Sequence, residues 1–432
     1  MTVTAIRGDF LHCLADPGEA GDAGAVEHLR DHVLIARDGI IEALRPADAT
    51  PLGADARAVD HRGRLIVPGF IDCHAHYPQV DVIASHGTQL LDWLEKYTFP
   101  AERAFADRAH ADAAAAFFLD RLLENGTTTA AVFCTVHPVS VEAFFCAAQA
   151  RKLRMIAGKC LMDRHCPEWL QDTAQSGYAE SRALIEKWHG RDRLGYAITP
   201  RYAPSCTPEQ LALAGQLARE CADTWIQSHV AENRREIAWA RELFPDAESY
   251  LAVYDRAGLL RERAIYGHCI WFDAEDRARM ARTGAAAAHC PTSNLFLGSG
   301  LYDLAAARAA GMRTGLATDV GGGTSYSMLT TLGEAYKVQQ LQGATLVPAQ
   351  ALFLATLGGA QALGLADRIG NFQVGKEADC AVLDARSSPL TARRTGLRDD
   401  ALDTFFALTL LADTRVVVET YILGERAVRG CA

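Results

Sequence analysis

Eight short apolar runs, separated by helical stretches, fill the middle of the chain and constrain its fold more than any other feature. The stretches between them are rich in alanine, glutamate and arginine, as in Arg108–Gly126, which ends in a helix-stopping Asn-Gly pair. Eight strands that alternate with helices predict a (β/α)8 barrel, with a doubly wound open sheet as the alternative. No GxGxxG or GxxxxGK[ST] motif follows any of the runs, which weakens a nucleotide-binding open sheet. We expect the strands at Leu65–Asp72, Thr127–Phe133, Met155–Lys159, Leu194–Thr199, Thr224–Ser228, Ala264–Gly267, Ala285–Ala288 and Thr314–Thr318.

The two ends of the chain have a different texture, with short apolar runs joined by turns. Val33–Leu44 contains Asp38-Gly39, which is a hairpin signal between two strands. Ile369–Ala385 and Thr414–Arg429 are predicted to be short strands joined by glycine turns. We therefore predict a small β-sandwich domain built from residues 1–66 and 370–432, and a barrel domain of residues 67–369 that carries the active site.

Composition and charge limit the partners and the compartment. The net charge of −10 argues against a polyanionic partner such as nucleic acid. No run approaches the roughly 20 apolar residues that span a bilayer, and the first residues lack the basic and apolar regions of a signal peptide. Twelve cysteines, from Cys13 to Cys431, include no CxxC pair and are expected to be reduced and mostly buried. We expect a soluble cytoplasmic protein with a small-molecule substrate and neither nucleic acid nor membrane as partner.

Metal-ligand residues close several of the predicted strands, at the edge where barrels build their active sites. PGFIDCHAHYPQ places His74 and His76 after the first strand, QSHVAEN places His229 after the fifth, and LATDVGGG places Asp319 after the eighth. Side chains at i and i+2 of a strand point the same way, so His74 and His76 can face one ion. Three imidazoles and a carboxylate suit Zn²⁺, with Fe²⁺ or Mn²⁺ as alternatives. Such a site keeps a position for water and lowers the pKa of that water towards about 7.

Four further polar residues at this edge have more than one interpretation. Glu232 either carries protons between water and substrate or is a surface charge in AENRRE. His268, in YGHCIW, either hydrogen-bonds the water, ligates the metal or packs in the core. Arg201, in TPRYAPS, either binds a substrate oxygen or ring nitrogen or forms a structural ion pair. Gln79 donates and accepts at once, which suits the amide-like edge of a heterocycle.

The segments PGFIDCHAHYPQ, SHVAEN, GHC, HCPTSN and ATDVGGG, in this order, resemble the amidohydrolase superfamily. LLDWLEKYTFPAE, TPRYAPSCT and GTSYSML resemble more specifically the guanine deaminases of that superfamily. The similarity runs from the PGFID strand through IGNFQVGKEADC and so covers essentially the chain. The resemblance implies a distorted (β/α)8 TIM barrel with a flanking β-sandwich, one zinc ion per subunit and a homodimer.

The resemblance also implies a role for each residue at the strand ends. Glu232 would carry protons, His268 would orient the attacking water, and Asp319 would accept the proton of that water. Attack at C2 of guanine, protonation of N3 by Glu232 and loss of ammonia would give xanthine. The implied zinc ligands are His74, His76, His229 and Asp319. The implied substrate contacts are Gln79, Arg201, Tyr202, His76, His229 and Glu232. Some relatives carry phenylalanine at the position of Tyr202, and stacking on the ring survives that change.

Other enzyme classes and a non-enzyme relative are the alternatives to a guanine-specific hydrolase. The H-x-E and P-C-x-x-C signature of cytidine deaminases is absent, and so is the GxSxG elbow of serine hydrolases. Two-metal amidohydrolases need a bridging lysine where this chain has Arg201. Deaminases of pterins or other purines and chlorohydrolases of triazines stay open as enzyme alternatives. The non-enzyme alternative is a metal-free structural or interaction relative of the barrel, which the presence of the ligand set disfavours.

Overall fold

The computed structural model describes residues 2–50, 56–87 and 89–427. Contacts divide the chain into two compact units. One unit consists of Met1–Asp72, Asp120–Thr129 and Tyr326–Ala432, and the other of Cys73–Leu119 and Ala130–Ser325. The predicted site residues, from His74 to Asp319, all belong to the second unit. We describe the two units separately.

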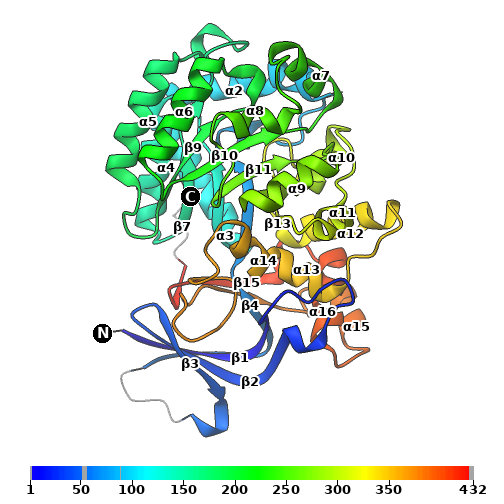
Figure 1. Ribbon diagram of the computed structural model, residues 1–432. Coiled ribbons are helices and arrows are strands. Elements are labelled where there is room, and N and C mark those ends of the chain that lie inside the picture. The colour runs from blue at the N-terminus through cyan, green and yellow to red at the C-terminus, as the bar shows by residue number, and fades with distance from the viewer. Residues whose placement is uncertain (1, 51–55, 88, 428–432) are drawn as a thin grey trace. The chain divides into compact units, whose positions relative to one another are not determined.

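A sheet of parallel strands in chain order forms the barrel (Figure 1). The strands from β7 to β13 pair in parallel with their neighbours. Main-chain hydrogen bonds from Asp319 N to His74 O (2.8 Å) and from His76 N to Val320 O (3.1 Å) join the segment after the last strand to the first strand. The barrel is therefore nearly closed, which confirms the predicted fold class and excludes the open doubly wound sheet. Its strands are β5 (Phe70–His76), β6 (Thr127–Phe133), β7 (Arg154–Gly158), β9 (Gly195–Pro200), β10 (Trp225–Val230), β11 (Ala264–His268), β12 (Ala286–His289) and β13 (Arg313–Leu316), and the short β8 (Cys160–Leu161) pairs with β9.

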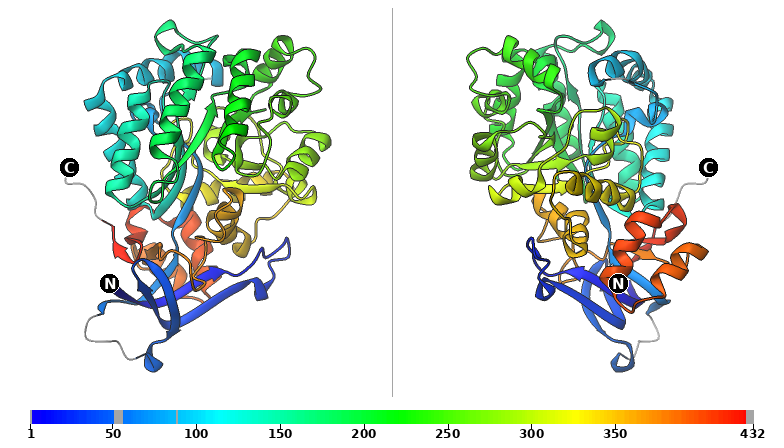
Figure 2. Two further views of the ribbon diagram at one scale, coloured as in Figure 1. Left: turned by 60° about the vertical axis from the view of Figure 1, so that its left-hand side comes forward. Right: turned by 90° about the vertical axis from the view of Figure 1, so that its right-hand side faces the viewer.

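Helices cover the outside of these strands, so both faces of the strands are shielded from solvent. Every residue of β5, β6 and β9 is buried, as expected for parallel strands covered on both faces. α4 packs on β7, and the neighbouring helices α5 and α6 pack on β9 (Figures 1 and 2). The helices between the strands are α1 (Leu90–Trp93), α2 (Phe99–Arg103), α3 (Arg108–Glu124), α4 (Pro138–Ala150), α5 (Ala174–Trp188), α6 (Pro208–Glu220), α7 (Arg234–Leu243), α8 (Tyr250–Arg256), α9 (Ala274–Thr283), α10 (Pro291–Phe296) and α11 (Leu304–Ala309).

Both ends of the chain build one separate sheet, as predicted. Its order is β16-β15-β14-β4-β1-β2-β3, so strands from the C-terminal part continue a sheet that the N-terminal part begins. The predicted turn at Asp38-Gly39 joins β2 to β3, and both residues have a positive φ (48° and 87°), as a tight hairpin turn requires. The strands are β1 (Val3–Cys13), β2 (Val26–Arg37), β3 (Ile40–Pro46), β4 (Arg57–Pro68), β14 (Cys380–Leu383), β15 (Val417–Ile422) and β16 (Glu425–Arg426). Residues 428 and 429 of the predicted Thr414–Arg429 segment lie outside the described residues.

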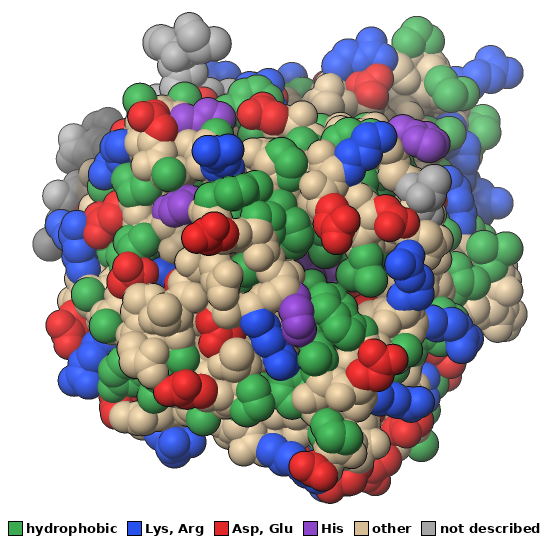
Figure 3. All heavy atoms as spheres, turned by 90° about the horizontal axis from the view of Figure 1, so that it is seen from above, with side chains coloured by type: hydrophobic (Ala, Val, Ile, Leu, Met, Phe, Trp, Pro, Cys, Tyr) green, Lys and Arg blue, Asp and Glu red, His purple; other side chains and the backbone are tan. Residues whose placement is uncertain are grey.

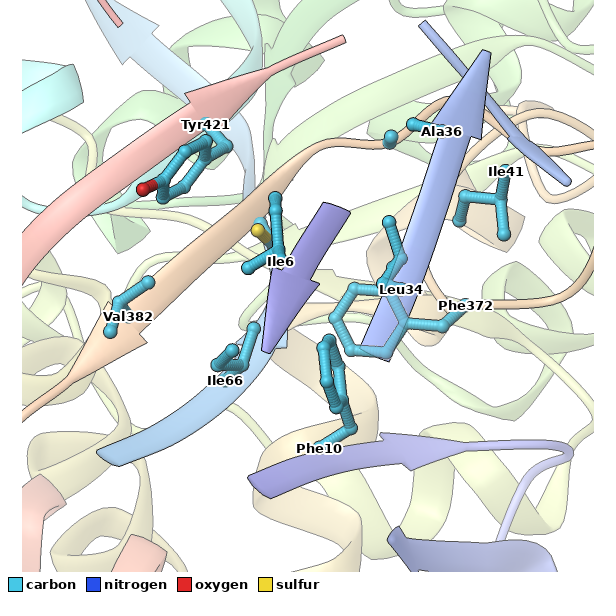
Figure 4. Close-up of a cluster of buried hydrophobic side chains, with 11 residues drawn as sticks. Ile6, Phe10, Leu34, Ala36, Ile41, Ile66, Phe372, Val382 and Tyr421 are labelled. Carbon is cyan, nitrogen blue, oxygen red and sulfur yellow. The ribbon is translucent and has the colours of Figure 1, made fainter. Parts of the chain in front are cut away.

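A hydrophobic cluster holds this sheet together and draws on both ends of the chain (Figure 4). Ile6 and Phe10 of β1 meet Val382 of β14 and Tyr421 of β15 in it. The C-terminal part is less β-rich than expected, because only residues 380–383 of Ile369–Ala385 form a strand. The helices of this unit are α12 (Met328–Leu341), α13 (Pro348–Ala355), α14 (Leu357–Ala362), α15 (Pro389–Thr395) and α16 (Ala401–Leu411).

The surface and the cysteines show few special features. Within the described ranges, no helix combines the length and the apolarity needed to cross a membrane. Acidic and basic side chains are interspersed on the face shown in Figure 3, so that face carries no patch of a single sign. The eleven cysteines in the described part of the chain form no disulfides with one another, and most of them are buried; Cys431 lies outside that part.

Candidate functional site

The predicted metal ligands meet at the carboxyl edge of the barrel strands. His74 and His76 lie on β5, His229 lies on β10 and Asp319 follows β13. Four pairs of these residues bring their side-chain nitrogen or oxygen atoms within 3.4 Å of each other: His74 and His76 Nε2 (3.2 Å), His76 and His229 Nε2 (3.0 Å), His74 Nε2 and Asp319 Oδ1 (3.3 Å), and His76 Nε2 and Asp319 Oδ1 (3.4 Å). The four side chains therefore form one cluster.

These spacings fit the ligand shell of one small cation. Four ligand atoms placed tetrahedrally at about 2.0–2.1 Å from a zinc ion are about 3.3 Å from one another. Burial holds the pKa of His74, His76 and His229 well below its usual range, with mutual repulsion of the imidazoles as a further cause. The rings are therefore neutral and offer lone pairs. The Nδ1–H of His229 donates to the carbonyl oxygen of Arg201 (2.6 Å), which leaves Nε2 free to bind a metal.

The backbone is strained where it delivers these side chains. Ala231, His268, Cys269 and Asp319 all have a positive φ, between 50° and 72°, although none of them is glycine. L-residues rarely adopt this region, at a cost on the order of 1–3 kcal/mol each, and such residues gather at functional sites. At Asp319 the unusual φ accompanies the bonds that tie the segment after β13 to β5. Four non-glycine residues with a positive φ thus lie at the edge that carries the candidate ligands.

Glu232 and His268 form a second layer beside the ligand cluster. Glu232 is 3% exposed, which excludes the surface-charge interpretation. Its Oε2 lies 3.3 Å from His268 Nε2, and its Oε1 accepts a hydrogen bond from Ser299 Oγ (2.9 Å). Burial, and then the charge of Asp319, raise the pKa of Glu232 to about 8. The carboxyl group therefore holds a proton at neutral pH and can release it to a bound molecule.

His268 is oriented for hydrogen bonding by its other nitrogen. The Nδ1–H of His268 donates to Asn294 Oδ1 (2.9 Å), so Nε2 carries the lone pair in the neutral ring. That nitrogen faces Glu232 and lies 3.8 Å from Asp319 Oδ2. His268 also belongs to a second possible ligand group with His74 and His229. The structure therefore places His268 beside the cluster, where it can accept a proton from water or bind a metal.

Arg201 combines the two interpretations that its sequence context left open. Its Nη1 donates to both carboxylate oxygens of Glu102 (2.9 and 2.8 Å), and the pair is buried. Arg201 also lines the pocket next to the ligand cluster, together with Gln79. Glu102 is the last residue of the LLDWLEKYTFPAE segment, and no sequence pattern assigned a role to it. Its partner is 99 positions away along the chain, so only the fold reveals the pair.

The pocket itself is small and partly open to solvent. Apolar side chains form part of its wall, among them Trp93 of α1 and Leu297, which follows α10. This combination of apolar walls with a few polar groups is typical of sites for small flat molecules. The residues that line it are His76, Gln79, Leu90, Trp93, Leu94, Arg201, Tyr202, His229, Glu232, Glu236, His268, Leu297, Asp319 and Gly322.

Comparison with known proteins agrees with this arrangement. The sequence profile of the amidohydrolase family matches residues 65–427. The chain belongs to the amidohydrolase family. It is 46% identical to the guanine deaminase of Escherichia coli (strain K12) over 429 residues, which cover 98% of this chain and 97% of the relative. This amidohydrolase also superposes on solved structures of guanine deaminases.

Two of these structures are informative. The structure of the E. coli guanine deaminase has a TM-score of 0.96 and 45% identity, and covers 99% of each chain. The structure of a guanine deaminase from C. acetobutylicum, solved with guanine bound in its active site, has a TM-score of 0.89 and 26% identity. It covers 99% of this amidohydrolase and 100% of the other chain. The similarity therefore spans both the barrel and the separate sheet.

Replacement of His229 by alanine tests the ligand cluster. We expect the His229→Ala protein to lose its metal, because three ligands with a fourth position empty bind a divalent ion far more weakly. Metal content per chain, measured by plasma mass spectrometry after gel filtration, is the readout. His61→Ala is the matched control, since His61 is a buried histidine of the separate sheet that bonds to Tyr421. A His229→Ala protein with the metal content of the unaltered protein would contradict the assignment.

Proposed function

We propose that this amidohydrolase hydrolyses guanine to xanthine and ammonia with one zinc ion per subunit. The observation that carries the proposal is the convergence of three neutral imidazoles and a carboxylate next to a pocket whose opposite groups are Arg201 and Gln79. The guanine deaminases that the chain resembles, one of them with guanine in its active site, support this choice of substrate.

The ion would be held by four residues from three strand ends, those of β5, β10 and β13. Three nitrogen ligands and one carboxylate oxygen favour zinc, while Fe²⁺ and Mn²⁺ remain chemically compatible. When bound, the ion supplies the acidity that lowers the pKa of a water towards about 7 and makes that water nucleophilic. Burial raises the pKa of Asp319 to about 6, so its carboxylate can take up the proton of the water. The proposed ligands are His74, His76, His229 and Asp319.

Protons would reach the substrate through Glu232. Because the pKa of Glu232 is raised to about 8, its carboxyl group holds a proton at neutral pH. It would deliver that proton to N3 of guanine as water adds to C2. The proton that Asp319 takes from the water would then pass to the departing amine as the C2–N bond breaks, and Glu232 would regain a proton from the hydroxyl group on C2 as the C2 carbonyl forms. His268, whose Nε2 accepts hydrogen bonds, would orient the water between Glu232 and Asp319. The two carboxylates would thus act in turn on one proton path.

The ring would be held by the pocket wall. Arg201 offers donors and Gln79 offers an amide to the polar edges of guanine. Tyr202 is buried and lines the pocket beside them, which suits stacking on a flat ring. His76, His229 and Glu232 line the same pocket and would also contact the substrate. The homodimer implied by the resemblance and the cytoplasmic location expected from the sequence pattern stay predictions.

The direct test is a product assay with and without metal. Metal-loaded protein is expected to convert guanine to xanthine with release of an equal amount of ammonia, to stop when a chelator removes the ion, and to recover when zinc is added. A pterin, other aminopurines and a chlorotriazine in the same assay separate the enzyme alternatives. Guanine left unchanged by metal-loaded protein would refute the proposal. Turnover of one of the other compounds alone would identify that compound, instead of guanine, as the substrate.

Glu232→Gln tests the proton path separately from the metal. The glutamine keeps the shape of the side chain but cannot release a proton, so kcat should fall by about 100-fold or more. Metal content should stay unchanged. Asp276→Asn is the control, because burial raises the pKa of Asp276 too, while its partner is Ser249 and it does not line the pocket. If the Glu232→Gln protein retains the kcat of the unaltered protein, Glu232 does not carry the proton to the substrate.

A further inference from the structure

Glu102 is a buried carboxyl side chain that bonds to two polar side chains of the pocket wall, Arg201 and Gln79, without lining the pocket itself. It lies on α2 and is 1% exposed. Its two oxygens accept from Nη1 of Arg201 (2.9 and 2.8 Å), and Oε1 also accepts from Nε2 of Gln79 (3.1 Å). One carboxylate therefore bonds to two side chains that come from the ends of different strands, β9 and β5.

The bond to Glu102 decides which end of the Gln79 amide faces the carboxylate. If the amide turned over, its Oε1 would meet Glu102 Oε1 at the 3.1 Å of the present bond, with no proton between two acceptors. Buried acceptors that face each other in this way are strongly unfavourable. The Oε1 atom of Gln79, which can only accept hydrogen bonds, therefore does not face Glu102 and is available to other donors.

The loop after β13 keeps the amide in place on its other side. Gly321 has a φ of 120°, and a Cβ at this position would overlap the Gln79 amide. The glycine backbone thus lies directly against Oε1, in the loop that also carries Asp319. Gln79 is held between this loop and Glu102, and both Gln79 and Gly322 line the pocket.

Glu102 fixes Arg201 in a similar way. The hydrogen bonds recorded for the Arg201 side chain within the described residues all run from Nη1 to Glu102. The guanidinium group is planar, so fixing Nη1 also fixes the direction of the other N–H groups. The ring of Phe99, one turn before Glu102, lies 5.5 Å from the guanidinium carbon and packs against it. Arg201 and Gln79 both line the pocket. Glu102 therefore fixes two groups of the pocket wall, the guanidinium donors of Arg201 and the Gln79 amide with its Oε1 turned away from Glu102.

We propose that Glu102 is a positioning residue that sets this donor and acceptor order and thereby selects substrates with a carbonyl group beside a ring N–H. Guanine has such an edge at C6 and N1. 2,6-Diaminopurine has the inverted edge, an amino group beside an unprotonated nitrogen, although it carries the same amino group at C2. The inference rests on the proposed function, because it names how that site chooses among 2-aminopurines.

Glu102→Gln is the variant that tests the proposal. A glutamine at this position can donate to Gln79 Oε1, so the Gln79 amide becomes free to turn over, and Arg201 loses its fixed anion. A site built to hydrogen-bond one edge rejects the inverted edge by about 10⁴-fold, so the preference for guanine over 2,6-diaminopurine, as a ratio of kcat/KM values, should fall by about 100-fold or more. Metal content should stay unchanged. Glu102→Asp keeps the carboxylate and should retain most of the preference even where kcat falls.

Asp172→Asn is the matched control. Asp172 forms a buried ion pair with Lys159 (2.5 Å) in the same unit and does not line the pocket. The control should lower the thermal midpoint and leave the substrate preference unchanged. This comparison separates the loss of a buried ion pair from the loss of positioning.

The outcomes distinguish this inference from the proposed function. If the unaltered protein deaminates guanine but folded, metal-loaded Glu102→Gln keeps its preference, Glu102 is not a positioning residue and only this inference fails. If the unaltered protein leaves guanine unchanged, the proposed function fails first. If the Glu102→Gln protein does not fold, the Gln79→Met protein is measured instead. This substitution removes the Gln79 amide and keeps the ion pair between Glu102 and Arg201. An unchanged preference in Gln79→Met would equally overturn the inference.

Discussion

Three imidazoles and a carboxylate gather at one edge of the barrel, and neighbouring nitrogen and oxygen atoms of the four side chains lie 3.0–3.4 Å apart, a spacing that fits one small cation. Burial keeps the rings of His74, His76 and His229 neutral, so each ring has a nitrogen lone pair to offer to a cation. Asp319 and the neighbouring His268 adopt strained backbone conformations at the strand ends. Glu232, His268 and the pocket lie beside this cluster.

Two buried glutamates serve this site in different ways because their neighbours differ. Glu102 accepts hydrogen bonds from a guanidinium group and an amide. Burial and the nearby charge of Asp319 raise the pKa of Glu232 to about 8 and keep a proton on it at neutral pH. The same side chain is thus suited to a fixed acceptor in one place and to the proposed proton transfer in the other. The difference follows from local contacts rather than from the residue type.

The local patterns of the sequence were sufficient for the barrel and for the ligand cluster. The His74 and His76 pair has the period of a strand, and the remaining ligands stand at the ends of other apolar runs, so their meeting follows from the barrel. The Asp38-Gly39 turn was equally predictable from its chemistry. Glu102 was not, because its bonds to Arg201 and Gln79 depend on how α2 packs beside two strand ends. The helices α15 and α16 were also missed, since the C-terminal pattern was interpreted as short strands only.

X-ray absorption at the zinc edge of the zinc-loaded protein tests the central claim most directly. We predict one ion per chain, with a single shell of nitrogen and oxygen ligands at about 2.0–2.1 Å. The spectrum should also show the outer-shell scattering that imidazole ligands give. A sulfur shell at about 2.3 Å would contradict this prediction and would point instead to the group that contains Cys290, His268 and Asp319. A second metal at about 3.5–4 Å would contradict it as well, because the site would then be a two-metal centre.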